Sequence, residues 1–569
     1  RKWWHGRRAV AAIAGLAAVA LIVAFAVSAV SGGGHPRRQP GQSAAAASPT
    51  SASAPSATSG SAGAGSPGRQ LAGIRTFQFT PQGTDQLTVT VYDLRRHGPF
   101  LTLDFKAAGP PGSNGDLAFD FYEGEGTFGF NSLDGIRLLD PVHNKVYRAV
   151  QDSQQNDWQS QLDVSLEAAT SELLWVTFPA PPRSVKRLDV LFSNGGPQLT
   201  GVPITTASAG PSASQVGTGV EVPPPATFAE PRGSTDTSGL TLPVNSLILT
   251  VGNKSGADAE SATSATVTLN TDVLFDFDKS NLTPQASKIL RATAAKVSRG
   301  ATGGVTVDGY TDSIGTDAVN IPLSQARAQA VVTALQSLTP GVSYTSHGHG
   351  SADPVAPNTK PDGSDNPAGR ALNRRVTITY NIKAPAPPAP PPAAAPAPAS
   401  SGGATGSVTY HAASGSNYRV RVDHLYREGD LVVADFGAKC LASFGNSCNY
   451  QTDFSAQVPS EGSVDVPPVP ADQNSVPGFD SSFAAADAVY LEDPNGSIYD
   501  PAHDDANVRG SQLVANTDTL QGSEGPKPFE PLWAYFPAPP ANVKTMSFVL
   551  PGGTTRIANV PVEARSPRS

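Results

Sequence analysis

Two side chains of opposite charge stand where a predicted strand leads into a predicted helix. Asp312 ends the segment GYTD, and Arg327 falls in the first turns of the helix expected over PLSQARAQAVVTALQSL, facing back toward the loop. A carboxylate accepts hydrogen bonds from an ammonium group, and a guanidinium holds a carboxylate through two parallel hydrogen bonds. Such a pair suits a ligand that carries both groups on one carbon. The alternative is a simple ion pair between loop and helix, the usual outcome for an arbitrary Asp and Arg.

The segments around these residues alternate between strand-like and helix-like patterns. VTLNTDVLFDF, GVTVDGY, VSYTSHGHG and RRVTITYNI are predicted strands. The first helix is expected to begin with Thr283 as its N-cap and Pro284 at its first position, and Asn320 can cap the second helix. The order β-α-β-α-β-β predicts an α/β sandwich, in which helices cover one face of a sheet.

Three motifs in this block occur together and in order: DFDKSNLTPQA, GYTDSIGTDAVNIPLSQARAQAV and NPAGRALNRRVTITY. Together they resemble the peptidoglycan-binding domain of the OmpA-like family, named after the C-terminal domain of outer-membrane protein A. The resemblance covers residues 265–383 of the 569 and says nothing direct about the rest of the chain.

The resemblance implies non-covalent binding of peptidoglycan without a cofactor. The ligand would be the diaminopimelate of the stem peptide, which offers an ammonium and a carboxylate on one carbon. Asp312 would accept from the ammonium and Arg327 would hold the carboxylate. The resemblance also implies supporting contacts from Asp278, Asn320 and Arg374.

Neighbouring residues have other interpretations. Ile314 departs from the family pattern, which commonly has a small hydroxyl residue there, so one hydrogen bond to the ligand is expected to be missing. Arg375 points to the opposite face of its strand from Arg374 and is interpreted as structural. His347 and His349 lack a third ligand, so no metal is expected.

The amino-terminal segment predicts export. RKWWHGRR carries four fixed positive charges, and residues 9–30 that follow carry none. As a helix that stretch spans about 33 Å, enough to cross the bilayer core, and the basic residues keep its start in the cytoplasm. We therefore expect a single-pass membrane protein whose extracytoplasmic part links membrane to cell wall. The alternative is a cleaved signal peptide and a secreted protein.

Stretches rich in Ser, Ala, Gly and Pro divide the exported part, because they cannot bury enough apolar surface to offset their ordering entropy. The chain is thus predicted to be a multidomain α+β protein. Its expected parts are a basic stub and transmembrane helix (1–30), a tether (31–72), a β-sandwich (73–206), a linker (207–237), the OmpA-like domain (238–383), a Pro/Ala-rich linker (384–406) and a second β-sandwich (407–563).

The two flanking blocks are interpreted as copies of one another. VTVYDLRRHGPFLTLDF matches VRVDHLYREGDLVVADF, and LLWVTFPAPPRSVKRLDVLF matches PLWAYFPAPPANVKTMSFVL, in the same order. Alternating apolar residues between turn signals predict antiparallel β-sandwiches, with a protein or glycan as a possible ligand. The second copy contains Cys440 and Cys448, the only cysteines, which are predicted to form a disulfide in an exported protein.

Other function classes have less support. The formal charge of −8 gives no general basis for nucleic-acid binding. A flagellar-stator-like protein needs an acid within its membrane segment, and residues 9–30 have none. The remaining alternative is a wall hydrolase or adhesin with an OmpA-like targeting module, in which an acidic cluster of the second copy serves as acid and base. That cluster is Asp493, Asp500, Asp504 and Asp505. However, it surrounds a turn sequence and no hydrolase motif accompanies it, so no enzymatic activity is expected.

Overall fold

The computed structural model describes the chain in several stretches. They are residues 75–79, 87–109, 133–153 without 134, 157–159, 170–192, 196–206, 220–222, 237–383 without 254 and 361, 406–441 without 413 and 414, 454, 489–504 and 529–564. Within these stretches no helix has the length and apolar character needed to cross a membrane. The expected membrane segment, residues 9–30, and the tether that follows it lie outside the described residues.

The first β block consists of two sheets that enclose a common core. One sheet has the order β1 (Arg75–Phe79), β2 (Leu87–His97), β3 (Phe100–Ala108), β6 (Thr170–Pro179) and β9 (Val220–Val222). The other contains β4 (Arg137–Asp140), β5 (Lys145–Tyr147), β7 (Arg187–Leu191) and β8 (Gln198–Pro203). Leu103 and Val176 of the first sheet and Leu138 and Val190 of the second are fully buried in one cluster, the arrangement of a β-sandwich.

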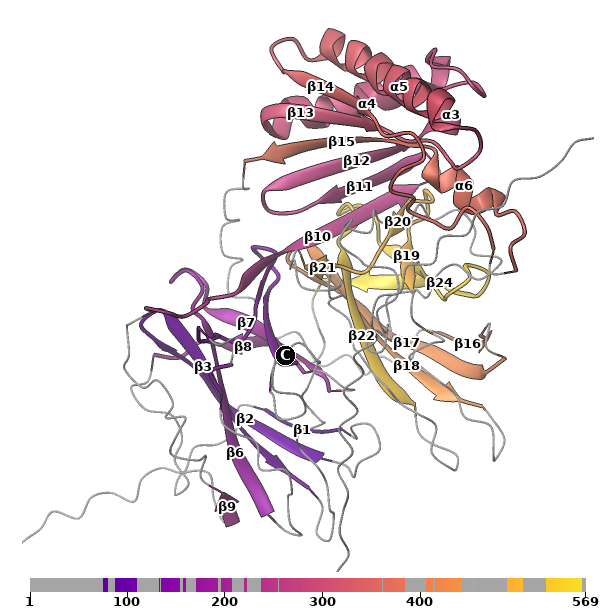
Figure 1. Cartoon of the computed structure of the whole chain (residues 1–569). Coiled ribbons are helices and arrows are strands. Elements are labelled where there is room, and N and C mark those ends of the chain that lie inside the picture. The colour runs from indigo at the N-terminus through magenta and orange to yellow at the C-terminus, as the bar shows by residue number, and fades with distance from the viewer. Residues whose placement is uncertain are drawn as a thin grey trace, which may run out of the picture. The chain divides into compact units, whose positions relative to one another are not determined.

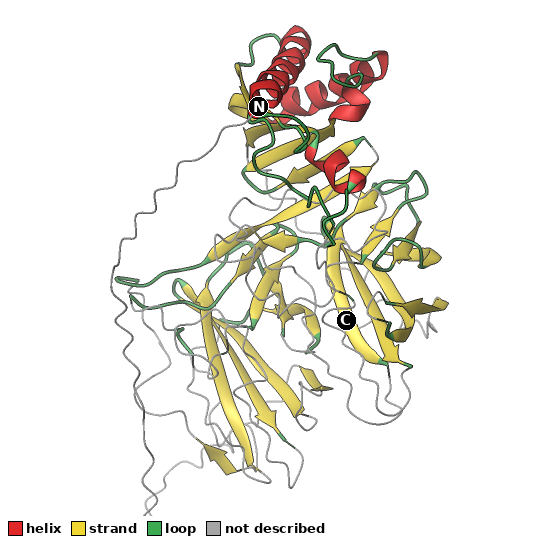
Figure 2. Ribbon diagram, turned by 45° about the vertical axis from the view of Figure 1, so that its right-hand side comes forward, coloured by secondary structure: helices red, strands yellow, loops and turns green. Residues whose placement is uncertain are grey.

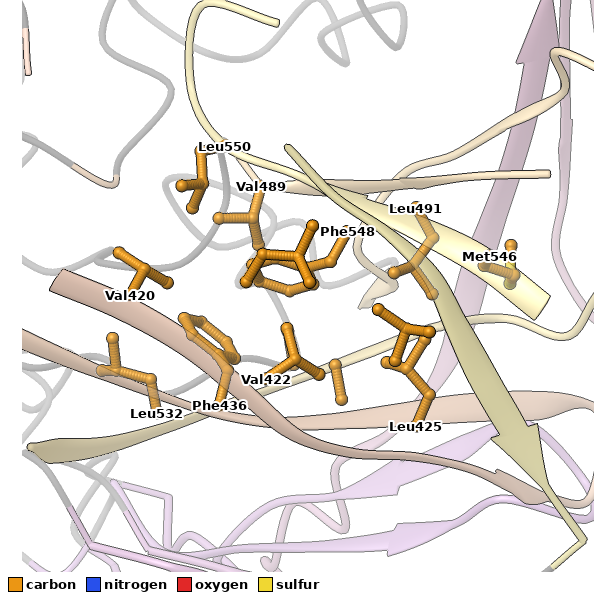
Figure 3. Packing of buried hydrophobic residues seen from close by; sticks show 14 of the residues in the cluster. Val420, Val422, Leu425, Phe436, Val489, Leu491, Leu532, Met546, Phe548 and Leu550 are labelled. Carbon is orange, nitrogen blue, oxygen red and sulfur yellow. The ribbon is translucent and has the colours of Figure 1, made fainter. Parts of the chain in front are cut away.

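The second β block repeats this arrangement. One sheet has the order β16 (Gly406–His411), β17 (Asn417–Glu428), β18 (Leu431–Cys440) and β22 (Glu530–Pro537). The other contains β19 (Tyr490–Glu492), β20 (Ile498–Tyr499), β23 (Thr545–Val549) and β24 (Arg556–Glu563), and β21 (His503–Asp504) lies nearby in the chain. Figure 3 shows Val422 and Phe436 of one sheet packed against Leu491 and Phe548 of the other.

Details of the two blocks correspond residue by residue. The register shifts between Val91 and Asp93 in β2 and between Val422 and His424 in β17. Arg96 of the first block donates to the carbonyl of Pro181 at 2.8 Å. In the same way Arg427 of the second block donates to the carbonyl of Pro539 at 2.6 Å. Both blocks thus have a bulge at the same position and an arginine that donates to the FPAPP segment. These shared features agree with a duplication.

The central block is a mixed sheet with helices on one face (Figures 1 and 2). Its strand order is β10 (Val244–Asn253), β11 (Gly256–Glu260), β12 (Ser264–Asn270), β15 (Arg375–Ile382), β13 (Ala301–Gly309) and β14 (Tyr344–Gly348). Only β13 and β14 are parallel in this order. Its helices are α3 (Thr271–Leu274), α4 (Pro284–Gly300), α5 (Asp317–Leu338) and α6 (Pro367–Asn373). Leu290 of α4 and Val331 of α5 share one core with Val307 and Ile378 of the sheet.

Strand β10 takes part in more than one block. Its residues 249–253 pair with β11, whereas residues 244–246 pair with β5 of the first block. Residues 247–248 pair with β21, and residues 251–252 pair with β20 of the second block. One strand therefore contributes backbone hydrogen bonds to all three blocks.

The expected β-α-β-α-β-β order is present, with corrections at the ends of elements. The strand expected through residue 277 ends at Asn270, whose side chain accepts from the amide of Asp272 at 2.8 Å and begins the short helix α3. Thr283 caps α4 as predicted, accepting from the amide of Ala286 at 3.2 Å. Asn320 is not a cap, because α5 begins earlier, at Asp317, and Asn320 lies within it. Helix α6 was not expected.

Candidate binding site

The candidate site lies at the end of the central sheet, where β13 and β15 run side by side. Gly309 of β13 pairs with Val376 of β15, so Asp312, just after β13, and Arg374, just before β15, reach the same end. Helix α5 brings Arg327 to them because it passes very close to the strands. A Cβ atom on Gly309 would lie 2.2 Å from the carbonyl oxygen of Ser324. Glycine at this position therefore permits the approach that positions Arg327.

Asp312 is buried and held at both oxygens. Its side chain accepts from the amide of Ile314 through Oδ1 at 3.0 Å and from Nη1 of Arg374 through Oδ2 at 2.6 Å. Nε of Arg370 lies 3.7 Å from the same Oδ2. Two arginine side chains therefore lie beside this one carboxylate.

Arg374 joins Asp312 to a second acid that sequence analysis missed. Its Nε and Nη2 donate to the two carboxylate oxygens of Asp272 at 2.9 and 2.5 Å. These bonds raise the pKa of Arg374 above its ordinary value against the effect of burial, and the bond to Asp312 adds to the increase. Asp272 was missed because its segment was expected to be a strand. The signal was the capping asparagine at position 270, two residues earlier.

Arg327 is buried, with a relative exposure of 5%, and differs from Arg374 in its partners. Its Nε donates to the carbonyl of Lys279 at 3.0 Å, and its guanidinium lies 5.5 Å from the ring centre of Phe275. Burial lowers the pKa of Arg327, and the charges of Asp272, Asp278 and Asp312 oppose this effect. Among the described residues it forms no ion pair, and none of them accepts a hydrogen bond from its two terminal nitrogens. The simple Asp312–Arg327 ion pair is thus not what the structure contains.

The remaining predicted residues lie around this centre in different ways. Asn320, with a relative exposure of 4%, donates from Nδ2 to the carbonyl of Ile314 at 3.1 Å and so braces the loop after Asp312. Asp278 is exposed and has a left-handed backbone, with φ of 53°. It acts on Arg327 through its charge, and the structure gives it no direct contact with Arg327. Sequence analysis also missed Arg370, which pairs with Asp365.

Exposed apolar side chains stand next to residues of the site in the sequence. Phe277 precedes Asp278, Ile314 follows the Asp312 turn, and Val319 and Ile321 flank Asn320. Their relative exposures range from 46% to 86%. A large ligand that reaches Arg327 would therefore also meet apolar surface.

Arg375 and His349 have partners close by in the structure. Arg375 lies over the ring of Tyr310, with 3.7 Å between the guanidinium carbon and the ring centre, and donates to the carbonyl of Asp353 at 2.9 Å. His349 stacks on the same ring, that of Tyr310, and its Nε2 lies 2.9 Å from a carboxylate oxygen of Asp308. The described part of the chain contains no group of three metal-ligating side chains.

The described acids of the second β block have different surroundings. Despite partial burial, hydrogen bonds from Ser497 and Asn495 lower the pKa of Asp493, which caps a turn. Asp504 pairs with Arg148 of the first block at 2.8 Å. Burial raises the pKa of Asp500 to about 7. Asp505 lies outside the described residues.

The predicted disulfide is described at one end only. Cys440 is disulfide-bonded, and Cys448, the other cysteine of the chain, lies outside the described residues.

Asp500 gives a prediction for stability against pH. Its folded-state pKa lies above its unfolded value near 4, so its contribution to stability is present below ~pH 4 and is lost as the pH rises through about 7. At roughly 1.4 kcal/mol per pKa unit, the free energy of unfolding should fall by up to about 4 kcal/mol over this window. Asp500→Asn should flatten this dependence in thermal melts between pH 4 and 8. An unchanged slope would contradict the assignment.

The central block is a small α/β-sandwich domain whose sheet end carries a buried arginine beside a fixed carboxylate. Residues 274–367 match the model of the OmpA family. The chain therefore carries an OmpA-family domain, as the sequence motifs predicted.

Relatives share this part of the chain. Photosystem I P700 chlorophyll a apoprotein A2 of Gloeobacter violaceus is 43% identical over 110 residues, 19% of this chain and 12% of that protein. Outer membrane protein A of Bordetella avium is 40% identical over 116 residues, 20% of this chain and 56% of that protein. Peptidoglycan-binding protein ArfA of Mycobacterium tuberculosis is 36% identical over 126 residues, 22% of this chain and 36% of that protein. The chain thus spans between about an eighth and just over half of these relatives.

Proposed function

We propose that the OmpA-family domain binds peptidoglycan non-covalently and recognises the diaminopimelate of its stem peptide. The observation that carries the proposal is the state of Arg327: a buried guanidinium without an ion pair in the described structure, beside a carboxylate already fixed by Arg374. The name of the mycobacterial relative, a peptidoglycan-binding protein, supports the same ligand.

The geometry suits an amino-acid centre. A ligand carboxylate would accept two parallel hydrogen bonds from the terminal nitrogens of Arg327, which restores the charge compensation that burial removes. The ammonium on the same carbon would then face Asp312. Arg374, with Asp272, positions Asp312, and Asn320 fixes the loop that carries it. We assign Asp278, which is exposed near Arg327, a supporting contact to the ligand.

We also propose that the chain is an extracytoplasmic envelope protein without enzymatic activity, anchored in the membrane by residues 9–30. The acids of the second β block support the absence of a hydrolase, because Asp493 caps a turn and Asp504 is paired with Arg148. The proposed role is to hold the cell wall next to the membrane.

The test compares two wall types. The full chain, in detergent, is co-sedimented with insoluble peptidoglycan whose stem peptide contains either diaminopimelate or lysine at the third position. Lysine lacks the second carboxylate, so Arg327 would have no partner. We expect pelleting with the diaminopimelate wall only, and release by free diaminopimelate. Equal pelleting with both walls would overturn the recognition of diaminopimelate, and no pelleting with either would overturn wall binding.

A further inference from the structure

One face of the second β-sandwich is buried although it points away from the core of its own block. Strand alternation sends Val432, Phe436 and Leu532 into that core. The residues between them belong to a different apolar cluster and have relative exposures of at most 3%; they are Tyr426, Leu431, Val433, Trp533 and Tyr535. We call these five residues the aromatic face.

The aromatic face shares its cluster with the first β block. Leu139 of β4, Val146 of β5 and Leu191 of β7 belong to it, together with Leu247 of β10. None of the three side chains from the first block is part of that block's own core. Both surfaces are thus apolar patches on the outsides of their sandwiches, and each is covered in the structure.

Hydrogen bonds fix how the two surfaces meet. Nε1 of Trp533 donates to the carbonyl of Gly196 at 3.0 Å, and the hydroxyl of Tyr535 donates to Oδ2 of Asp189 at 2.9 Å. Burial, with the charge of Asp189, raises the pKa of Tyr535 far above its ordinary value, so the hydroxyl keeps its proton. A buried donor without an acceptor is unfavourable, so each of these bonds selects one alignment of the blocks.

A second contact lies beside the aromatic face. Asp504 has no exposed side-chain surface and pairs with Arg148 of the first block at 2.8 Å. The turn between β17 and β18 also approaches the first block closely. A Cβ atom at Gly429, which has a φ of 61°, would lie 2.5 Å from the carbonyl oxygen of Pro141. A buried charge pair and a close backbone approach are features of an interface with matched surfaces.

The face of the first block that corresponds to the aromatic face is more polar. By strand register, Tyr426, Val433 and Tyr535 correspond to Arg95, Thr102 and Thr177. Arg95 pairs with Asp104 at 3.0 Å, and the hydroxyls of Thr102 and Thr177 lie 3.1 Å apart. The other two positions stay apolar, because Leu431 corresponds to Phe100 and Trp533 to Trp175. Three of the five positions are thus polar in the first block. The two copies therefore meet through unlike faces, a heterologous contact rather than a two-fold one.

The second block differs from the apolar patch of the first at one of its three positions, because Ile498 and Val549 stand in place of Val146 and Leu191 but Glu492 stands in place of Leu139. Leu139 pairs with Asp189 between β4 and β7, and Glu492 pairs with Ser547 at the same place between β19 and β23. Glu492 forms an ion pair with Arg556 at 2.7 Å. A heterologous contact can add further copies without limit unless one of the two surfaces is missing on the last copy. The charged pair on the second block would be buried against an apolar face, which is unfavourable, so a third copy should not bind there.

We propose that the aromatic face is a recognition surface for the β4, β5 and β7 sheet of the first block. The two sandwiches then pair through unlike faces within a single chain. The ion pair of Glu492 with Arg556 prevents the aromatic face of another chain from binding to the second block. This pairing does not depend on whether the central domain binds peptidoglycan.

The test separates the copies covalently and asks whether they stay together. A protease site is placed in the 384–406 linker of the full chain, the protein is cut, and the fragments are examined by size-exclusion chromatography at low micromolar concentration. The cut wild-type fragments should co-elute. Leu139→Glu gives the first block the residue that the second has at this position, and Val433→Glu alters the opposite surface. Each should weaken the association at least 100-fold and separate the fragments.

Leu338→Glu is the matched control, because Leu338 is 41% exposed on α5 and the same substitution there should leave the fragments together. Circular dichroism melts check that each sandwich remains folded. Separation of the cut wild type would overturn the pairing. Co-elution of both folded glutamate variants would overturn the assignment of the surface. Co-sedimentation with peptidoglycan, run in parallel, should not change in either variant.

Discussion

Arg327→Ala should weaken binding to diaminopimelate-containing peptidoglycan by about 100-fold or more. Loss of one partner from a buried, hydrogen-bonded charge pair costs about 2–5 kcal/mol. Arg370 and Arg374, the arginines beside Asp312, are already paired with acids. Alanine is a good helix former, so α5 should persist. Arg327→Lys keeps the charge but loses the parallel pair of donors, and should fall between wild type and alanine.

The control for this series is Arg291→Ala, which removes the same charge from an exposed position on α4. Binding is measured by co-sedimentation and by titration with free diaminopimelate, with a thermal melt of each variant. Binding by a folded Arg327→Ala that equals that of Arg291→Ala would show that Arg327 does not hold the carboxylate.

Arg374→Ala should affect both stability and binding. Arg374 bonds to Asp272 and Asp312, and its loss leaves Asp312 with only the more distant Arg370. Hydrogen bonds to charged groups contribute about 1.5–3 kcal/mol each, and partial exposure of Arg374 and Asp272 reduces this, so we expect a loss of about 2 kcal/mol in the free energy of unfolding. Binding should weaken about tenfold because Asp312 is no longer held.

This prediction is distinguished from simple destabilisation by Arg299→Ala, an exposed arginine near the end of α4, which should change neither quantity. Denaturant unfolding gives the stability, and binding is measured well below the melting temperature. A variant that loses stability but binds like wild type would limit Arg374 to a structural role.

Sequence patterns predicted the two main site residues, Asp312 and Arg327, but not the contacts that each of them makes. Asp312 and Arg327 stand in motifs whose flanking glycines and helix signals fix their positions along the chain. Their partners depend on local competition that periodicity does not reveal. The segment after β12 has the composition of a strand, yet the side chain of Asn270 captures the amide of Asp272 and turns the chain into α3. That turn brings Asp272 to Arg374. Arg374 also donates to Asp312, so Asp312 pairs with Arg374 and not with Arg327.

The relation between the blocks was not predictable for a different reason. Strands β17, β18 and β22 carry apolar residues on both faces, but the sequence does not say what covers the second face. The linkers, by composition, suggested independent domains. Trp533 and Tyr535 find their acceptors in Gly196 and Asp189, more than three hundred residues earlier in the chain. Contacts of this range follow from surface complementarity and not from local propensity.

Strand β10 has a mechanical consequence. If the central domain holds a wall under turgor, tension on it enters β10 directly, and the hydrogen bonds from β10 to β5, β20 and β21 carry that load into both sandwiches. Several such bonds pulled along the strand direction share the force and must break together, whereas bonds pulled open one at a time fail at low force. Tension between the wall and the first sandwich would thus act on the backbone hydrogen bonds between β10 and β5, which resist it together.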